Sequence, residues 1–158
     1  MNLKKLLSFI SLGFGSGLSP IAPGTAGSIV AACIYYFLFS SFIENYVHFF
    51  LFILFFIFCF LIGLYIYPRT VEGEEDPGSF VWDEFVGMWI ACIPIALFEK
   101  GLPWLFLAFV LFRLFDIWKP GLIKEYDNKE GAFNVMIDDV FAGSLSALIV
   151  FVMLLIIY

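Results

Sequence analysis

Long apolar runs dominate the chain and confine most polar residues to a few short segments. Five runs approach the roughly 20 residues that a membrane-spanning helix needs, and they cover residues 28–43, 46–67, 80–98, 102–118 and 140–158. The second run is the clearest, because His48 is its one polar interruption, whereas the third is the weakest because Asp83 and Glu84 lie at its start. The chain is 63% hydrophobic with a mean hydropathy of +1.02. The pattern therefore predicts an all-α, multi-pass membrane bundle of about five spans.

The N-terminal apolar stretch, residues 1–17, is short and lacks the small-residue cleavage pattern of a signal peptide. We expect it to be retained as an interfacial helix, followed by a Gly/Pro-rich loop. The 158 residues leave no room beside the spans for a separate soluble domain of typical size. One membrane-embedded domain over residues 1–158 is the predicted organisation.

Basic residues fall almost entirely on one side once the five runs are threaded through a bilayer. Lys100 is the exception, and the remaining seven share the side of the N-terminus: Lys4, Lys5, Arg69, Arg113, Lys119, Lys124 and Lys129. Cytoplasmic segments are enriched in lysine and arginine, so this side is predicted to be the cytoplasm. Twelve of the fourteen carboxylates fall there too, with Glu44 and Glu99 outside. We therefore expect the active site at the cytoplasmic interface.

The net charge of −6 argues against nucleic-acid binding. It is also unusual for a protein that meets anionic lipid, so the acidic groups call for a cation. Cys33, Cys59 and Cys92 lie singly inside apolar runs, where buried side chains are expected, and their spacing suggests neither a metal site nor a disulfide framework. The sequence indicates membrane lipids as partners and gives no indication of a protein partner.

Residues 13–28 contain five glycines and two prolines and cannot form a regular helix throughout. Hydroxyls at Ser16, Ser19, Thr25 and Ser28 add donors to a glycine-rich backbone that can approach a ligand closely. The next helix is expected to start near residues 25–28, where its N-terminus could hold an anion. The alternative is a packing loop whose small residues let helices approach each other.

Two vicinal acidic pairs lie beside apolar runs. Asp76, followed by proline, predicts a helix start that would put Asp83 and Glu84 about two turns into the helix. Asp138 and Asp139 are expected to open the last apolar helix. Carboxylates entering a membrane are costly and indicate function. Two pairs on one side favour a hard divalent cation held by oxygen ligands.

Arg113, Asp116 and Lys119 are spaced three residues apart, so all three can lean toward one side of a helix that Pro120 ends. In one reading they form a phosphate clamp, with Asp116 orienting the cations or binding metal. In the other they form an intramembrane ion pair that fixes helix packing.

Carboxylates for a cation, basic groups for a phosphate and a glycine-rich loop together indicate metal-assisted phosphoryl chemistry. A small transporter or channel is the main rival, but it would need polar groups at the midplane and on both sides, and the outer halves of the runs are almost purely apolar. A non-catalytic scaffold would not need two acidic pairs. The absence of a histidine from the cytoplasmic segments excludes a histidine nucleophile.

Four segments of the chain resemble the phosphatidylglycerophosphatase A family of bacterial membrane lipid phosphatases. They are GFGSGLSPIAPGTAGS (13–28), GSFVWDEFVGMWI (78–90), FRLFDIWKP (112–120) and MIDDVFAG (136–143), in that order. The resemblance implies a bacterial inner (cytoplasmic) membrane enzyme that uses Mg²⁺ to remove the terminal phosphate of phosphatidylglycerophosphate, giving phosphatidylglycerol. One segment departs from the pattern, because residues 130–134 read EGAFN where some members carry His-Gly-Gly-x-Gly.

The residues and the resemblance together suggest specific roles. We expect metal ligation by Asp83, Glu84, Asp138 and Asp139, catalytic roles for Asp83, Glu84, Asp116 and Asp139, and phosphate binding by Arg113, Lys119, Ser16, Ser19 and Thr25. Attack by a metal-activated water is favoured over an aspartyl-phosphate intermediate, because several carboxylates are assigned to the metal. Another phospholipid monophosphate is the alternative substrate.

Overall fold

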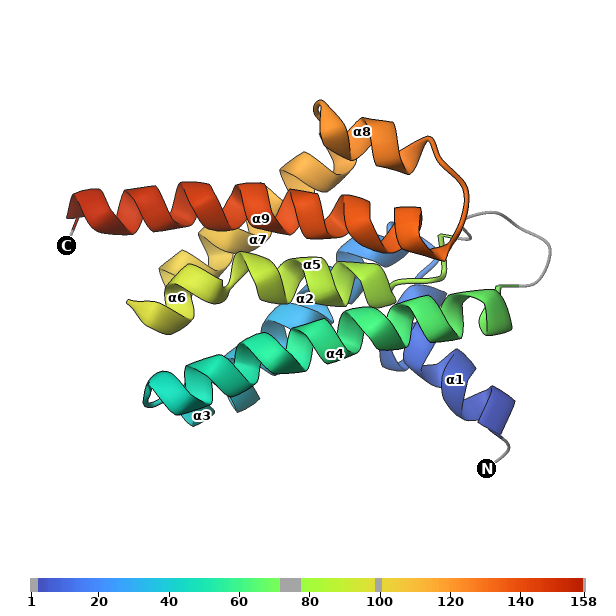
Figure 1. Ribbon diagram of the computed structural model, residues 1–158, viewed down its shortest axis with the longest axis horizontal. Coiled ribbons are helices and arrows are strands. Elements are labelled where there is room, and N and C mark those ends of the chain that lie inside the picture. Colours follow the sequence, from blue (N-terminus) through green and yellow to red (C-terminus); the bar gives the residue numbers. More distant parts are fainter. Residues whose placement is uncertain (1–2, 72–77, 99–100, 158) are drawn as a thin grey trace.

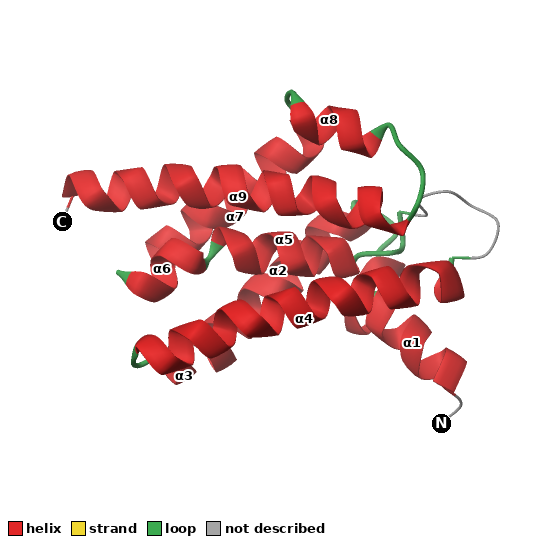
Figure 2. Ribbon diagram, viewed as in Figure 1, coloured by secondary structure: helices red, strands yellow, loops and turns green. Residues whose placement is uncertain are grey.

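The computed structural model describes residues 3–71, 78–98 and 101–157, which contain helices and connecting loops but no strand (Figures 1 and 2). The elements are α1 (Leu3–Ser11), η1 (Gly13–Leu18), α2 (Pro23–Ile34), η2 (Tyr35–Phe39), α3 (Ser40–Phe42), α4 (Tyr46–Thr70), α5 (Trp82–Ala91), α6 (Ile93–Leu97), α7 (Leu102–Trp118), α8 (Leu122–Asp127) and α9 (Ala132–Ile157). The predicted all-α class is confirmed.

Three segments are long and apolar enough to cross a membrane. They are α2 with η2 and α3 (Pro23–Phe42), α4 and α9, of 20, 25 and 26 residues. The α7 helix has the predicted bounds, and its 17 residues are at the short end of the spanning range. The chain is a membrane protein, and the expected count of about five spans is approximate.

The N-terminal segment follows the predicted plan, with a short helix and then an irregular loop. Phe14 and Gly15 in η1 have φ angles of 58° and 101°, in the left-handed region that regular helices do not use. The α2 helix starts at Pro23, slightly earlier than predicted, because the fixed φ of proline suits the first position of a helix.

The run 80–98 is not a single helix, so that prediction is wrong. It breaks at Cys92 between α5 and α6, because Pro94 has no N–H to donate to the carbonyl one turn back. The predicted helix start at residues 76–77 lies outside the described residues. Residues 78–81 are not helical, so Asp83 and Glu84 lie in the first turn of α5 rather than two turns inside it.

The last helix starts earlier than predicted. Because α9 begins at Ala132 rather than at residue 140, Asp138 and Asp139 lie nearly two turns inside it and do not open it. The positions expected for the two acidic pairs are therefore reversed, with one pair at a helix start and the other within a helix.

The α5 helix is the centre of the bundle, packed against α9, α2, α4 and α7. Two buried tryptophans anchor it: Nε1 of Trp82 donates to the Cys59 carbonyl of α4 at 2.9 Å, and Nε1 of Trp89 to the Ala31 carbonyl of α2 at 3.0 Å. Cys59 and Cys92 are buried as expected, but Cys33 is exposed, so that part of the prediction is wrong.

Different elements lie at the two ends of the bundle (Figure 1). The α1 helix, the end of α4 and the α8–α9 connection lie at one end, whereas α3, α6 and the C-terminus lie at the other. The first turns of α2 and α5 point toward the first end. Asp83 and Glu84 belong to the first turn of α5, Asp138 and Asp139 to the first half of α9, and Arg113 and Asp116 to the last turns of α7.

Candidate active site

Five carboxylates from three helices converge at this end of the bundle. One oxygen from each of Asp83, Glu84 and Asp139 lies within 4.8 Å of the other two, and the same holds for Asp116, Asp138 and Asp139. Asp139 belongs to both groups and joins α5 to α7. The structure thus brings together all five carboxylates that the sequence singled out.

Each acidic pair orients itself by the same local hydrogen bond. The backbone N–H of Glu84 donates to Oδ1 of Asp83 at 3.0 Å, and the backbone N–H of Asp139 donates to Oδ1 of Asp138 at 3.0 Å. Each bond fixes one oxygen of the first carboxylate against the backbone. The remaining carboxylate oxygens are left for other partners.

Two of those oxygens are buried without a partner among the described residues. They are Oε2 of Glu84 and Oδ2 of Asp139, whose residue is only 2% exposed. A buried polar oxygen without a partner is destabilising. A hard divalent cation prefers such oxygen ligands, so these residues fit Mg²⁺.

Arg113 lies between the acidic cluster and α2. Its Nη1 contacts Oδ2 of Asp116 at 2.7 Å and donates to Oγ of Ser28 at 3.2 Å. Its Nε is buried without a partner among the described residues, so a donor remains free for a ligand. Ser28 also donates to the Gly24 carbonyl at 2.8 Å. Ser28 is among the hydroxyls that the sequence indicates as donors but not among the residues expected to bind phosphate, and the structure places it against Arg113.

Lys119 is the second cation, and it ends α7 in a left-handed conformation with φ of 49°. Its Nζ contacts Asp138 at 2.8 Å and Asp116 at 4.0 Å, and it also pairs with Asp127 of α8, which the sequence did not indicate. Burial alone would lower the pKa of Lys119, but the Asp138 charge and the hydrogen bonds to Asp127 and Asp138 outweigh it and raise that pKa. Lys119 therefore stays positively charged at neutral pH.

The loop hydroxyls predicted to bind phosphate are placed differently from one another. Ser16 donates to the Gly13 carbonyl and Ser19 to the Ile21 carbonyl, each at 2.8 Å, so both bond their own loop. Thr25 follows Gly24 in the first turn of α2, and Gly24 lies directly against Glu84 and Arg113.

The charges of this cluster do not balance. Among the residues that the structure describes, five carboxylates (Asp83, Glu84, Asp116, Asp138 and Asp139) share this site with two cations, Arg113 and Lys119. Like charges in a poorly solvated site repel strongly. The arrangement is therefore suited to a bound cation, with Arg113 and Lys119 beside it to receive an anion.

Comparison with known proteins shows the family. The sequence model of phosphatidylglycerophosphatase A matches residues 9–154, nearly the whole chain. The chain belongs to the phosphatidylglycerophosphatase A family. Members of this family are lipid phosphatases, which are hydrolases, and this chain is one of them. The clustered carboxylates and cations described above lie in three of the four segments that resemble the family, residues 78–90, 112–120 and 136–143.

Three curated relatives cover most of the chain. The phosphatidylglycerophosphatase A of Escherichia coli is 41% identical over 87% of this chain and 77% of its own length. The protein of the same name from Haemophilus influenzae is 40% identical over 96% and 90%. A putative phosphatidylinositol-3-phosphatase of Bacteroides thetaiotaomicron is 37% identical over 89% of both chains. No solved structure matches the chain.

Proposed function

We propose that this protein hydrolyses phosphatidylglycerophosphate to phosphatidylglycerol and inorganic phosphate, with Mg²⁺ as cofactor, at the cytoplasmic face of the bacterial inner membrane. One observation carries the proposal: five carboxylates and two cations meet at one end of a membrane bundle. The names of the relatives from Escherichia coli and Haemophilus influenzae support this substrate.

The metal would be held by the acidic pairs. Asp83, Glu84 and Asp139 form one group of possible ligands, and Asp138 with Asp116 extends it through Asp139. The unpartnered oxygens of Glu84 and Asp139 favour this placement. When bound, Mg²⁺ supplies concentrated positive charge for phosphoryl transfer.

The two cations would bind the phosphate. Arg113 has a buried Nε without a partner among the described residues, and a guanidinium can bind two phosphate oxygens at once. Lys119 adds a second positive charge on the same side of Asp116 and Asp138. The first turn of α2, with Thr25, offers backbone N–H groups and a hydroxyl to the remaining oxygens.

Hydrolysis requires a base for the attacking water. The carboxylates of the Asp83, Glu84 and Asp139 group would divide two tasks between them, holding the cation and accepting the proton of that water. The water would attack phosphorus, the bond to the glycerol oxygen would break, and the proton taken from the water would pass to that departing oxygen, which leaves as a hydroxyl. We favour direct attack by water over an aspartyl-phosphate intermediate, because a bound cation would occupy several of these carboxylates.

The distribution of basic residues supports a cytoplasmic orientation of the site. Lys4, Lys5, Arg69 and Lys124 belong to the segments at the same end of the bundle as the acidic cluster. Basic residues favour the cytoplasmic side. The headgroup would therefore enter from the cytoplasmic leaflet while the acyl chains stay in lipid.

A second substrate class is supported by the Bacteroides thetaiotaomicron relative, which is named a putative phosphatidylinositol-3-phosphatase. That name also describes a phosphate monoester on a lipid headgroup. In this proposal the clustered side chains would bind the phosphate group and would not contact the alcohol to which it is esterified. The two candidates therefore share a site and differ in the leaving group.

The test is phosphate release by the purified protein in detergent, with phosphatidylglycerophosphate, phosphatidylinositol 3-phosphate and phosphatidic acid measured in parallel. We expect the first substrate to be turned over fastest, EDTA to stop the reaction and Mg²⁺ to restore it. Asp83→Asn should abolish turnover in protein that remains folded. Folded wild-type protein that releases nothing from phosphatidylglycerophosphate would reject the substrate, and release that EDTA leaves unchanged would reject the metal.

A further inference from the structure

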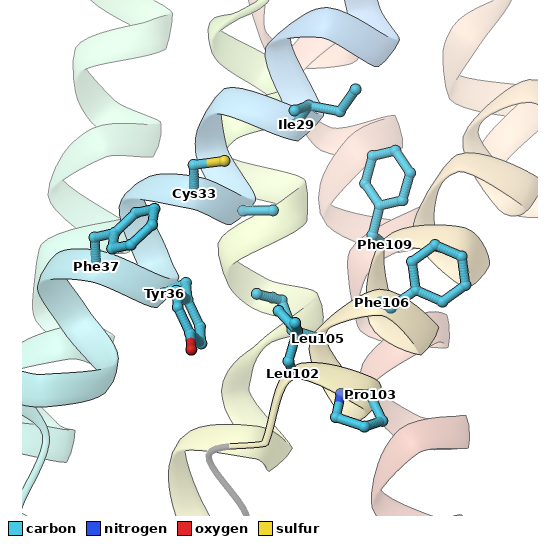
Figure 3. A pocket seen from close by; sticks show the side chains of 10 residues that line it. Ile29, Cys33, Tyr36, Phe37, Leu102, Pro103, Leu105, Phe106 and Phe109 are labelled. Carbon is cyan, nitrogen blue, oxygen red and sulfur yellow. The ribbon is translucent and has the colours of Figure 1, made fainter.

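An apolar groove of about 800 Å³ runs between two walls of the bundle. One wall is α2 continued by η2, with Ile29, Cys33 and Phe37, and the other is α7, with Leu102, Phe106 and Phe109 (Figure 3). Several of these side chains are well exposed, including Phe37 at 71% and Phe106 at 67%. The groove is therefore open to the surroundings of the bundle, which in this protein are lipid.

One end of the groove meets the candidate active site. Ile29 follows Ser28, and Phe109 lies one turn before Arg113 in α7. The hydrogen bond from Arg113 to Ser28 at 3.2 Å thus joins the same two helices immediately beyond this end. Figure 3 shows Ile29 and Phe109 at one end of the groove and Leu102 at the other. The apolar lining begins where the polar site ends.

The length of the groove suits the hydrocarbon part of one leaflet. Ile29 and Phe37 are eight residues apart, or about 12 Å along a helix, and half of a typical hydrocarbon core is about 15 Å. The far end of one wall is η2, a π-helical segment (Tyr35–Phe39) that interrupts the regular helix and changes the side-chain register there. The groove therefore runs from beside the polar site to the first turn of α7, at Leu102 and Pro103, away from the end of the bundle that holds the acidic cluster.

We propose that this groove holds one acyl chain of the phospholipid whose phosphate is cleaved. The proposal rests on the proposed function and adds a determinant of its substrate class. An acyl chain needs no hydrogen bonds, which matches the apolar lining, and a chain seated between α2 and α7 would carry its headgroup toward Ser28 and Arg113. Chain binding would then select diacyl lipids over water-soluble phosphate monoesters.

Cys33 offers a direct test of occupancy, because it is exposed in the groove wall while Cys59 and Cys92 are buried. The rate of alkylation of Cys33 by a maleimide would be measured in detergent with dioleoyl or dihexanoyl phosphatidylglycerophosphate. We expect the dioleoyl substrate to slow alkylation about tenfold, on the scale of apolar-pocket discrimination. The dihexanoyl substrate, which has the same headgroup, should have little effect.

The matched control places the thiol on α4 instead. In the double variant Cys33→Ser, Leu61→Cys the thiol lies on a lipid-exposed position outside the groove, and the substrate should not protect it. Equal protection at both positions, or equal protection of Cys33 by dioleoylglycerol, would overturn the proposal in favour of general lipid contact. A Cys33 that is already unreactive without lipid, because a second copy covers it, would also overturn it.

Turnover provides the second measurement. Cys33→Trp would fill the groove, and we expect about a tenfold rise in KM for the dioleoyl substrate with unchanged kinetics on the dihexanoyl one. Leu61→Trp, on the exposed face of α4, should change neither. If the Cys33→Trp protein is active and the ratio of its KM values for the two substrates is unchanged, the groove proposal is rejected while the proposed function still stands. Wild-type protein that turns over neither substrate would reject the proposed function, and Cys33 protection would still report whether the lipid chain lies in the groove.

Discussion

Gly24 of α2 lies so close to the carboxylate of Glu84 of α5 that a side chain at position 24 would displace it. A Cβ added to Gly24 would overlap Oε1 of Glu84 and would lie 3.2 Å from Nη2 of Arg113. The first turn of α2 therefore rests directly on the acidic and basic groups of the candidate site. This contact explains why a glycine-rich loop and an acidic pair about 60 residues later in the sequence act together.

Gly24→Ala should impair activity while leaving the fold intact. The atom that the new methyl group meets is the end of a flexible side chain, so Glu84 would move while the helix stays in place. Misplacing a catalytic group by about 1 Å can cost about 100-fold in rate. Alanine is also the better helix former, so the unfolding temperature in detergent should not fall. Gly78→Ala, whose Cβ would have 3.9 Å to its nearest neighbour, is the control. Equal activity in the two variants would contradict the contact.

Gly143→Ala should destabilise the protein. Its Cβ would overlap the backbone carbonyl of Gly87, where α5 and α9 are in contact, and backbone atoms cannot rotate away. Overpacking of this kind typically costs about 1–3 kcal/mol. Thermal unfolding in detergent would measure the loss, with the adjacent exposed position, in the variant Ser144→Ala, as the control. An unchanged unfolding temperature would show that the two helices can separate without cost.

Asp139→Asn should lower activity and raise the stability of the metal-free protein. Asp139 belongs to both carboxylate groups, so its loss should lower activity beyond the roughly 10- to 100-fold that removal of an outer metal partner costs. Removing one charge from a cluster with too few cations should raise the unfolding temperature in EDTA. Mg²⁺ should then stabilise the wild type and not the variant. A variant that Mg²⁺ stabilises as much as the wild type would remove Asp139 from the metal site.

Ser28→Ala tests the link between α2 and Arg113. The hydroxyl accepts from Arg113, and a hydrogen bond to a charged group is typically worth about 1.5–3 kcal/mol. We expect KM for the lipid phosphate to rise about tenfold or more as the guanidinium loses its position. Ser146→Ala is the matched control, because Ser146 is equally buried and bonds only the Ala142 carbonyl among the described residues. Similar kinetics in both variants would assign Ser28 a packing role.

The sequence predicted the helices well where length and hydrophobicity decide them. The 102–118 run became α7 with the same bounds, and the 46–67 run became most of α4. The errors came from local breaks and starts: Pro94 ends α5 near Cys92, and α9 begins at Ala132 well before its most apolar part. A run of apolar residues shows that a segment is desolvated, but it does not show where a helix starts within that segment.

The sequence by itself determined the membrane bundle, the one-sided distribution of charge and the residue types of the candidate site. These features follow from the free-energy cost of placing unpaired backbone groups and charged side chains in hydrocarbon. That cost depends on the composition of each segment by itself, so it can be read from the sequence. Only the tertiary structure decided that Asp139 joins two carboxylate groups and that Ser28, not Ser16 or Ser19, bonds Arg113. Those contacts depend on how closely α2, α5 and α9 pack through Gly24, Gly87 and Gly143. Such packing is a property of pairs of helices and cannot be inferred from any one segment.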